Sequence, residues 1–257
     1  MELIVSKVNG VATLKFNRPE VYNSFNQKMA FDFQKALDDC EKDETIRCII
    51  ITGEGKAFCA GQDLAEATDP NGPELKSIVR EHYNPIIIRL RKIEKPIIAA
   101  VNGVAAGAGA NIALACDIVL AKESASFIQA FSKIGLIPDS GGTFMLPRLV
   151  GFQKASALMM TGEKVMALEA AAMNMIHKAI PDEEFEQKVK ELSENLAQMP
   201  TFGLGLTKRA LNESLSNNLS QQLAVEEKLQ TEAGQSHDFN EGTAAFLEKR
   251  KPVFKGR

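Results

Sequence analysis

The stretch VNGVAAGAGANIALACDIVLA, residues 101–121, decides the fold class. It joins two short apolar runs, 97–101 and 117–121, which are typical of strands buried on both faces of a sheet. Between them, small residues at 103–110 form a turn that leads into a helix ending near residue 115. Strand, helix and strand in this order predict an α/β fold built on a parallel sheet.

The alternation of strands and helices extends upstream of this stretch. Residues 2–7 and 11–16 alternate apolar and polar side chains around Asn9-Gly10, a dipeptide that favours a two-residue hairpin turn. After the hairpin, a helix is predicted over 26–42, with Met29, Phe33, Leu37 and Cys40 on one face. A buried strand Ile46–Thr52 and a helix over 74–92, perturbed at Pro85, are predicted to follow.

The chain becomes helical throughout from Pro181 onward. Helices are expected at 182–198, 201–215, 218–233 and 238–249. We therefore predict an α/β core over residues 1–180 and a helical C-terminal region over 181–257. These helices either cover the core or serve an oligomer interface.

The composition excludes several classes of protein. The 257 residues are 45% hydrophobic and 25% charged, which argues against disorder and against a small disulfide scaffold. A net charge of -3 makes the chain a poor nucleic-acid binder. The N-terminal residues do not read as a signal peptide and no apolar run is long enough for a membrane span, so a cytoplasmic location is expected. The cysteines lack metal-ligand spacing and are interpreted as small buried thiols (Cys40, Cys48, Cys59 and Cys116).

Two turns rich in small residues, 58–64 and 102–110, are candidates for a binding site. Small residues let a ligand approach the backbone, and the first amides of a helix have no partner within the helix. Two such amides that converge would form an oxyanion hole. The alternative is that the small residues only pack strand against helix. A dinucleotide-binding loop is disfavoured, because Ile112 stands where the third glycine of G-x-G-x-x-G belongs.

Asp139 stands out in a third segment, residues 136–143, just before a helix that is expected to begin near Gly141. It is either the cap of that helix or a carboxylate that acts as base, acid or nucleophile. The three histidines, His82, His177 and His237, have no visible partner and are interpreted as structural or solvated. No G-x-S-x-G motif supports a serine hydrolase.

Taken together, FCAGQDL (58–64), residues 101–121 and KIGLIPDSGGTFMLPRLVG (133–151) resemble the enoyl-CoA hydratase/isomerase (crotonase) superfamily. The resemblance runs from NRPEVYNSFN (17–26) to AFLEKRKPVFKGR (245–257). It implies a crotonase-like spiral of stacked ββα turns with a helical C-terminal region, assembled as a homotrimer or a dimer of trimers. It also implies an acyl-CoA thioester substrate, with coenzyme A entering as part of that substrate and no other cofactor or metal.

The resemblance implies a catalytic role for three residues. The backbone N–H groups of Gln62 and Ala108 would polarise the thioester carbonyl, although Ala108 departs from the glycine common in the family. The two glutamates of the hydratases are replaced by Asn111 and Phe131, which leaves Asp139 as the acid and base. Substrate and CoA contacts are expected from Val21, Ser24, Ala60, Asp63, Leu64, Val104, Gly107, Phe131, Ile134 and Lys249.

Within the superfamily, long stretches such as residues 43–64 and 83–110 resemble isomerases of aerobic phenylacetate degradation, which convert a ring epoxide to an oxepin thioester. The dehalogenases that use an Asp nucleophile also rely on a Trp and a His, and this chain has no Trp. We therefore expect an isomerase. The alternatives are a hydratase with an unusual site, an Asp-nucleophile aryl-CoA hydrolase or dehalogenase, and a non-catalytic acyl-CoA-binding or RNA-associated scaffold.

Overall fold

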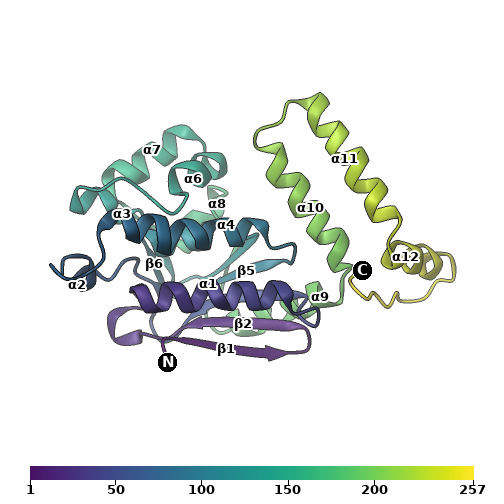
Figure 1. The fold of residues 1–257 in the computed structure, drawn as a ribbon, viewed down its shortest axis with the longest axis horizontal. Coiled ribbons are helices and arrows are strands. Elements are labelled where there is room, and N and C mark those ends of the chain that lie inside the picture. Colours follow the sequence, from purple (N-terminus) through teal and green to yellow (C-terminus); the bar gives the residue numbers. More distant parts are fainter.

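A computed structural model describes all 257 residues and contains two sheets, covering helices and a C-terminal helical arm (Figure 1). The larger sheet has the order β1-β2-β3-β5-β7-β10. Its strands are β1 (Leu3–Val8), β2 (Val11–Phe16), β3 (Cys48–Gly53), β5 (Ile97–Val101), β7 (Ile118–Lys122) and β10 (Lys178–Ile180). All neighbours are parallel except the hairpin β1–β2, which closes at Asn9-Gly10, where both residues have the positive φ that such a turn requires.

A second, smaller sheet has the order β4-β6-β8-β9. Its strands are β4 (Ala57–Cys59), β6 (Val104–Ala106), β8 (Ser126–Ile128) and β9 (Lys164–Met166). Three times a strand of the large sheet is followed by a short strand of this sheet and then by helical structure: β3 with β4, β5 with β6, and β7 with β8. The sequence did not reveal these short strands, because three residues are too few to show a period.

The first long helix, α1 (Gln27–Lys42), buries the predicted face. Asn26 caps it by accepting a hydrogen bond from the Met29 N–H at 2.8 Å. Phe33 then packs edge-on against Phe16, with ring centroids 5.0 Å apart. On the opposite face of the sheet lies α9 (Phe185–Gln198), whose apolar residues join a second core cluster with β3, β5 and β7. The central strands are therefore buried on both faces, as predicted.

The helix expected over 74–92 is instead a chain of three segments: α3 (Leu75–Ser77), a π-helical turn η2 (Ile78–Tyr83) and α4 (Asn84–Lys92). The perturbation was predicted at Pro85, and the irregular turn lies just before it, at Ile78–Tyr83. Because proline has no N–H, it cannot bond to the carbonyl oxygen four residues earlier, that of Glu81. Gln34 on α1 supplies the missing donor, with Nε2 2.7 Å from the Glu81 oxygen and 3.1 Å from the His82 oxygen.

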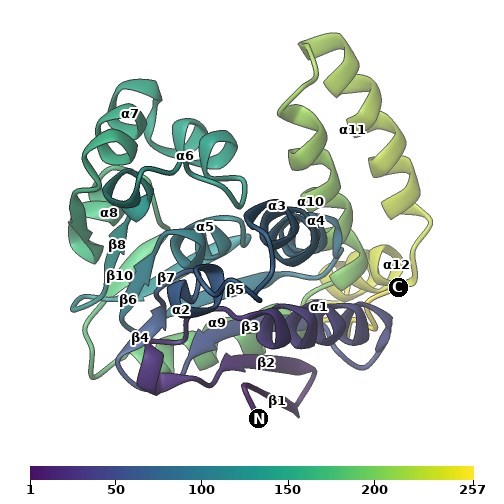
Figure 2. The same cartoon turned by 60° about the vertical axis from the view of Figure 1, so that its left-hand side comes forward.

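Four further helices belong to the core: α5 (Ala108–Leu114) lies inside it, and α6 (Gly142–Val150), α7 (Phe152–Thr161) and α8 (Ala167–Ala172) lie on the side away from the arm (Figure 2). Three shorter segments complete the core: η1 (Pro19–Val21) between β2 and α1, α2 (Leu64–Ala67) between β4 and α3, and η3 (Ala130–Ile134) between β8 and α6. All four cysteines are buried free thiols, as predicted. None of the helices is both long enough and apolar enough to cross a bilayer.

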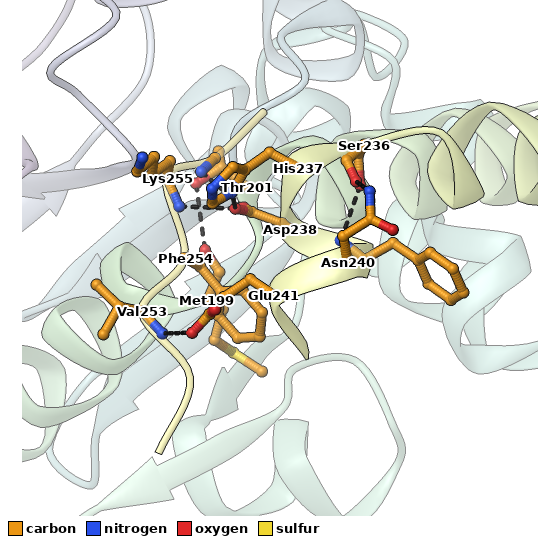
Figure 3. Close-up of polar contacts among 12 residues, drawn as sticks. Met199, Thr201, Ser236, His237, Asp238, Asn240, Glu241, Val253, Phe254 and Lys255 are labelled. Atoms are coloured by element: carbon orange, nitrogen blue, oxygen red, sulfur yellow. Dashed lines mark hydrogen bonds and ion pairs between the residues drawn. The ribbon is translucent and has the colours of Figure 1, made fainter. Parts of the chain in front are cut away.

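The arm consists of α10 (Thr201–Ser214), α11 (Leu219–Gly234) and α12 (His237–Leu247), which extend from the core in Figures 1 and 2. The last residues of the chain fold back onto the base of the arm (Figure 3). The buried Asp238 carboxylate accepts hydrogen bonds from the N–H groups of Lys255 at 2.7 Å and Gly256 at 2.6 Å. Glu241 accepts one from the Val253 N–H at 2.7 Å. The division between core and helical region at residue 180 remains a prediction, and α9 packs with the sheet.

Candidate active site

The two small-residue turns meet at one edge of the second sheet. Strands β4 and β6 are parallel, with Cys59 opposite Ala105. Three residues beyond this pair, the two chains reach Gln62 and Ala108. Gly61 lies where the turns touch, because a Cβ added to it would be 3.0 Å from the Ala106 oxygen and 3.4 Å from the Ala108 nitrogen. Its φ of +96° also requires glycine.

The Gln62 N–H is left free by the way its neighbours are held. The Phe25 N–H donates to the Gly61 oxygen at 2.7 Å, and the Asp63 N–H donates to the Phe25 oxygen at 2.9 Å. In such a parallel bridge the residues on either side bond to the neighbouring chain, while the central residue directs its own N–H away from it. The Gln62 N–H has no hydrogen-bond partner within the chain.

The Ala108 N–H is free for a different reason. Ala108 is the first residue of α5, and amides of a first helical turn have no acceptor in their own helix. Gly107 precedes it with φ +53° and ψ -127°, a conformation that disfavours any side chain, and no side chain caps the helix. Ala108 itself is helical, where alanine is well tolerated. The departure from glycine at this position therefore does not disturb the amide.

Asp139 lies in the turn before α6, and the structure shows that it is not the helix cap. The N-cap position belongs to Gly141, and no side chain caps the helix. The helix-cap interpretation of Asp139 is therefore wrong. Its carboxylate accepts a hydrogen bond from Ser140 Oγ at 2.9 Å. Burial raises the pKa of the Asp139 carboxyl despite this bond, and no cation opposes the effect.

Asn111 ties Asp139 to the helix that begins at Ala108. It is buried one turn into α5, where its Nδ2 donates to the backbone oxygen of Asp139 at 2.9 Å. Its Oδ1 accepts a hydrogen bond from Gln129 Nε2 at 2.8 Å. The space beside it is closed, because a Cβ added to Gly142 would lie 2.3 Å from Asn111 Nδ2. At a position where the hydratases are expected to carry a glutamate, this chain has a structural amide.

Phe131 gives the site an apolar wall. It is buried in η3, and its ring lies against Gly107, with Cζ 3.8 Å from the position that a Gly107 Cβ would occupy. Ile134, at the end of the same segment, is exposed. The second expected glutamate position therefore holds a side chain that repels water instead of activating it.

The segment 18–25 borders the loop of Gln62. The Ala60 N–H donates to the Tyr22 oxygen at 3.0 Å, in the same segment as Val21 and Ser24. Asp63 pairs with Arg18 at 2.9 Å and caps α2 by accepting a hydrogen bond from Ala65 N. The first residue of that helix, Leu64, is exposed.

Val104 and Lys249 occupy different surroundings. Val104 begins β6 and is half-buried between β4 and β8. Lys249 follows α12 in the arm, apart from the other candidate residues (Figure 1).

Tyr83 is a site residue that the sequence reasoning missed. It ends η2, its side chain is buried, and its hydroxyl donates to Gln62 Oε1 at 2.8 Å. The only signal in the sequence was Pro85, which perturbs the helix two residues later. The neighbouring His82 is also buried but packs edge-on against Phe31, with centroids 5.3 Å apart. None of the three histidines hydrogen-bonds to Asp139.

Comparisons with known proteins show the family to which the chain is similar. The model of the enoyl-CoA hydratase/isomerase family matches residues 6–257. The chain is 49% identical to a 1,2-epoxyphenylacetyl-CoA isomerase of Escherichia coli, with 100% of each chain covered. It is 46% identical to a probable enoyl-CoA hydratase of Rhodobacter capsulatus, covering 96% of this chain and 95% of that one. A putative enoyl-CoA hydratase/isomerase from Mycobacterium abscessus superposes with a TM-score of 0.93 at 34% identity, covering 99% and 100% of the two chains.

Proposed function

The chain belongs to the enoyl-CoA hydratase/isomerase (crotonase) family of acyl-CoA enzymes, and on that premise we propose that it is an isomerase. The predicted crotonase-like α/β fold is confirmed by the likeness to a solved family member. The proposed reactions are conversion of ring 1,2-epoxyphenylacetyl-CoA to the oxepin thioester and a shift of the double bond of a 3-enoyl-CoA to position 2. The first reaction would place the enzyme in phenylacetate catabolism, and it is the reaction for which one relative, a 1,2-epoxyphenylacetyl-CoA isomerase, is named.

The observation that carries the proposal is the set of side chains around the two free amides. Asp139 is a carboxylate without a cation, and its pKa is raised by burial. Both polar atoms of the Asn111 side chain are hydrogen-bonded, Nδ2 to the Asp139 backbone and Oδ1 to Gln129. The Phe131 side chain carries no acidic or basic group. Addition of water needs groups that deprotonate the water and deliver a proton to C2, whereas moving one proton within the acyl chain needs a single carboxylate.

In the proposed mechanism the thioester oxygen lies between the N–H groups of Gln62 and Ala108. Each donor of this kind contributes about 3–4 kcal/mol to transition-state stabilisation. Asp139 removes a proton from C2, the electrons pass into the thioester to give an enolate, and the same carboxyl returns the proton at C4. For the ring epoxide, Asp139 assists opening of the ring. Phe131 keeps water from the enolate.

The test is incubation of the protein with ring-epoxide phenylacetyl-CoA and, separately, with 3-hexenoyl-CoA, followed by chromatography of the products. The proposal expects the oxepin thioester from the first substrate or 2-hexenoyl-CoA from the second. A 3-hydroxyacyl-CoA product would indicate a hydratase instead. A covalent adduct on Asp139, detected by mass spectrometry, would indicate the nucleophilic hydrolase or dehalogenase. Absence of any turnover would favour a non-catalytic scaffold.

We also propose that the protein acts in the cytoplasm as a homotrimer or a dimer of trimers. The arm supports self-association, because several large apolar side chains there are exposed (Leu211, Leu219, Leu223, Phe246 and Leu247). In such an assembly, Lys249 of one copy would approach the CoA phosphates bound to another. Sedimentation velocity tests the assembly, and a monomer at micromolar concentration would contradict it. If Lys249 contacts phosphate, Lys249→Ala should raise KM and leave kcat nearly unchanged.

A further inference from the structure

The buried phenol of Tyr83 reaches the loop of Gln62 because of the π-helical turn η2. Pro85 leaves the Glu81 carbonyl without its helical donor, and Gln34 takes that place from α1. The wide turn that results buries both His82 and Tyr83. π-Helical turns inside α-helices are frequently found at functional sites. Here the turn directs a hydroxyl to a residue whose backbone N–H is free.

The Tyr83 hydroxyl is the strongest anchor of the Gln62 side chain. It donates to Gln62 Oε1 at 2.8 Å. The amide nitrogen of the same side chain makes only long contacts, 3.4 Å to the Asp63 oxygen and 3.3 Å to Glu66 Oε2. Burial, with nearby negative charges that include Asp139, holds the pKa of Tyr83 well above its usual range. The phenol therefore remains protonated and can keep donating at any working pH.

The loop of Gln62 is held from two sides. Phe25 bonds to the Gly61 oxygen and the Asp63 N–H on one side of the chain. Tyr83 holds the Gln62 side chain from η2, a segment 21 residues away. The Phe25 bond holds the carbonyl end of the peptide plane that carries the Gln62 N–H, and the Tyr83 bond adds a second restraint on that residue through its side chain. With Phe25 alone, the loop keeps its path, but the Gln62 side chain can leave its position.

We propose that Tyr83 is a positioning residue for the oxyanion site: its hydroxyl holds Gln62 so that the Gln62 N–H points at the thioester oxygen. This inference rests on the proposed use of that N–H. An enzyme depends strongly on the direction of such donors, because they must meet the charge where it develops. The alternative is that Tyr83 only packs, since its ring lies 5.9 Å from that of Phe25.

Tyr83→Phe separates these roles, because it keeps the ring and removes only the hydroxyl. If the hydroxyl positions the donor, kcat for 3-hexenoyl-CoA should fall about tenfold, with KM changed less than about twofold. Gln62→Leu, which keeps the backbone N–H but loses the Tyr83 bond, should have a similar effect. The double variant should be no slower than the slower single variant, because both remove the same interaction. Multiplied effects would overturn the inference. Gln187→Leu, on the exposed face of α9, is the control and should keep wild-type kcat.

A spectroscopic readout does not depend on which reaction is catalysed. The probe is phenylacetyl-CoA labelled with ¹³C at the thioester carbonyl, observed by infrared difference spectroscopy at saturating protein. Bound to the wild type, the carbonyl band should move to lower frequency than in buffer, since two donors polarise it. In Tyr83→Phe the displacement should become clearly smaller, because only the Ala108 donor keeps its direction. An equal displacement in both proteins would overturn the inference and leave the proposed function standing. No displacement in the wild type would contradict the oxyanion site itself, and this inference with it.

Discussion

Helices α5 and α11 illustrate two ways in which this chain uses a helix. Every residue of α5 is buried, and its first amide faces the site. Of the sixteen residues of α11, Leu229 is the buried one. In the proposed mechanism the first helix supplies a backbone N–H that comes close to the ligand, and its short, enclosed form fits that role. The second exposes the apolar side chains of Leu219 and Leu223.

The difference also appears in how glycine is used. In the core, glycines permit contacts that a Cβ would prevent: one added to Gly109 would lie 2.3 Å from the Cys59 oxygen. In the arm, the space around Gly203 in α10 is open, with no atom within 4 Å. Close backbone packing therefore limits which residues are tolerated around α5, whereas the surface of α10 has room for an added side chain.

The largest expected effect concerns the one side chain on which the site chemistry depends. Asp139→Asn should lower turnover of 3-hexenoyl-CoA by roughly 10²–10⁴-fold, because general acid–base catalysis contributes about that much. Binding of phenylacetyl-CoA, measured by calorimetry, should be largely kept. Asp182→Asn is the matched control, since Asp182 is also hydrogen-bonded to a serine hydroxyl, that of Ser124, but lies outside the site. Full activity in Asp139→Asn would remove Asp139 from the mechanism.

Replacing Gly109 and Gly203 by alanine should change the free energy of unfolding in opposite directions. Gly109→Ala should destabilise the protein by roughly 3 kcal/mol or prevent folding, because backbone atoms of Cys59 cannot move away easily. Gly203→Ala should raise stability by about 0.5–1 kcal/mol, since alanine loses less conformational entropy in a helix. Urea unfolding of both variants measures the difference. Equal effects would refute the contrast between the two halves.

The tail that closes the arm offers a smaller and more local effect. Asp238→Ala leaves the N–H groups of Lys255 and Gly256 without their acceptor, which should cost about 1–3 kcal/mol. Hydrogen exchange followed by mass spectrometry should become faster in residues 237–257 and remain unchanged in α5. A comparable increase in α5 would show that arm and site are one cooperative unit.

The pH dependence of stability should distinguish Asp139 from Asp182. Burial raises the pKa of Asp139 above its usual 3.8, so wild-type stability falls as pH rises from 3.8 through that higher value. Asp139→Asn should therefore be more stable than the wild type at pH 7, with the gain vanishing as pH falls toward 3.8. The Ser124 hydroxyl lowers the pKa of Asp182, so the control should instead lose stability at neutral pH. Urea midpoints between pH 4 and 8 test both signs.

Much of the large sheet and its helices could be predicted, because the spacing of hydrophobic residues and the turn residues can be read within short stretches of the sequence. Asn9-Gly10 predicted the hairpin, and the spacing of apolar residues predicted the buried face of α1. The second sheet could not be predicted from period, since its strands have three residues each. It was expected only through the family resemblance.

The candidate site could be predicted where a motif marked it and not where distant segments meet. Gln62, Ala108 and Asp139 came from motifs, and the structure brings their loops together; their catalytic roles remain predictions. The bond from Asn111 to the Asp139 backbone joins residues 28 positions apart. The bond from Tyr83 to Gln62 depends on a π-helical turn. Neither contact has a local pattern in the sequence.

The central claim is that two backbone amides and one carboxyl together labilise a proton next to a thioester. Exchange of the C2 protons of phenylacetyl-CoA in D₂O, followed by NMR, tests it most directly, because this thioester has no double bond or epoxide to rearrange. We expect the wild type to exchange these protons much faster than buffer does, and Asp139→Asn to exchange them at close to the buffer rate. Exchange by Asp139→Asn at the wild-type rate would contradict the account.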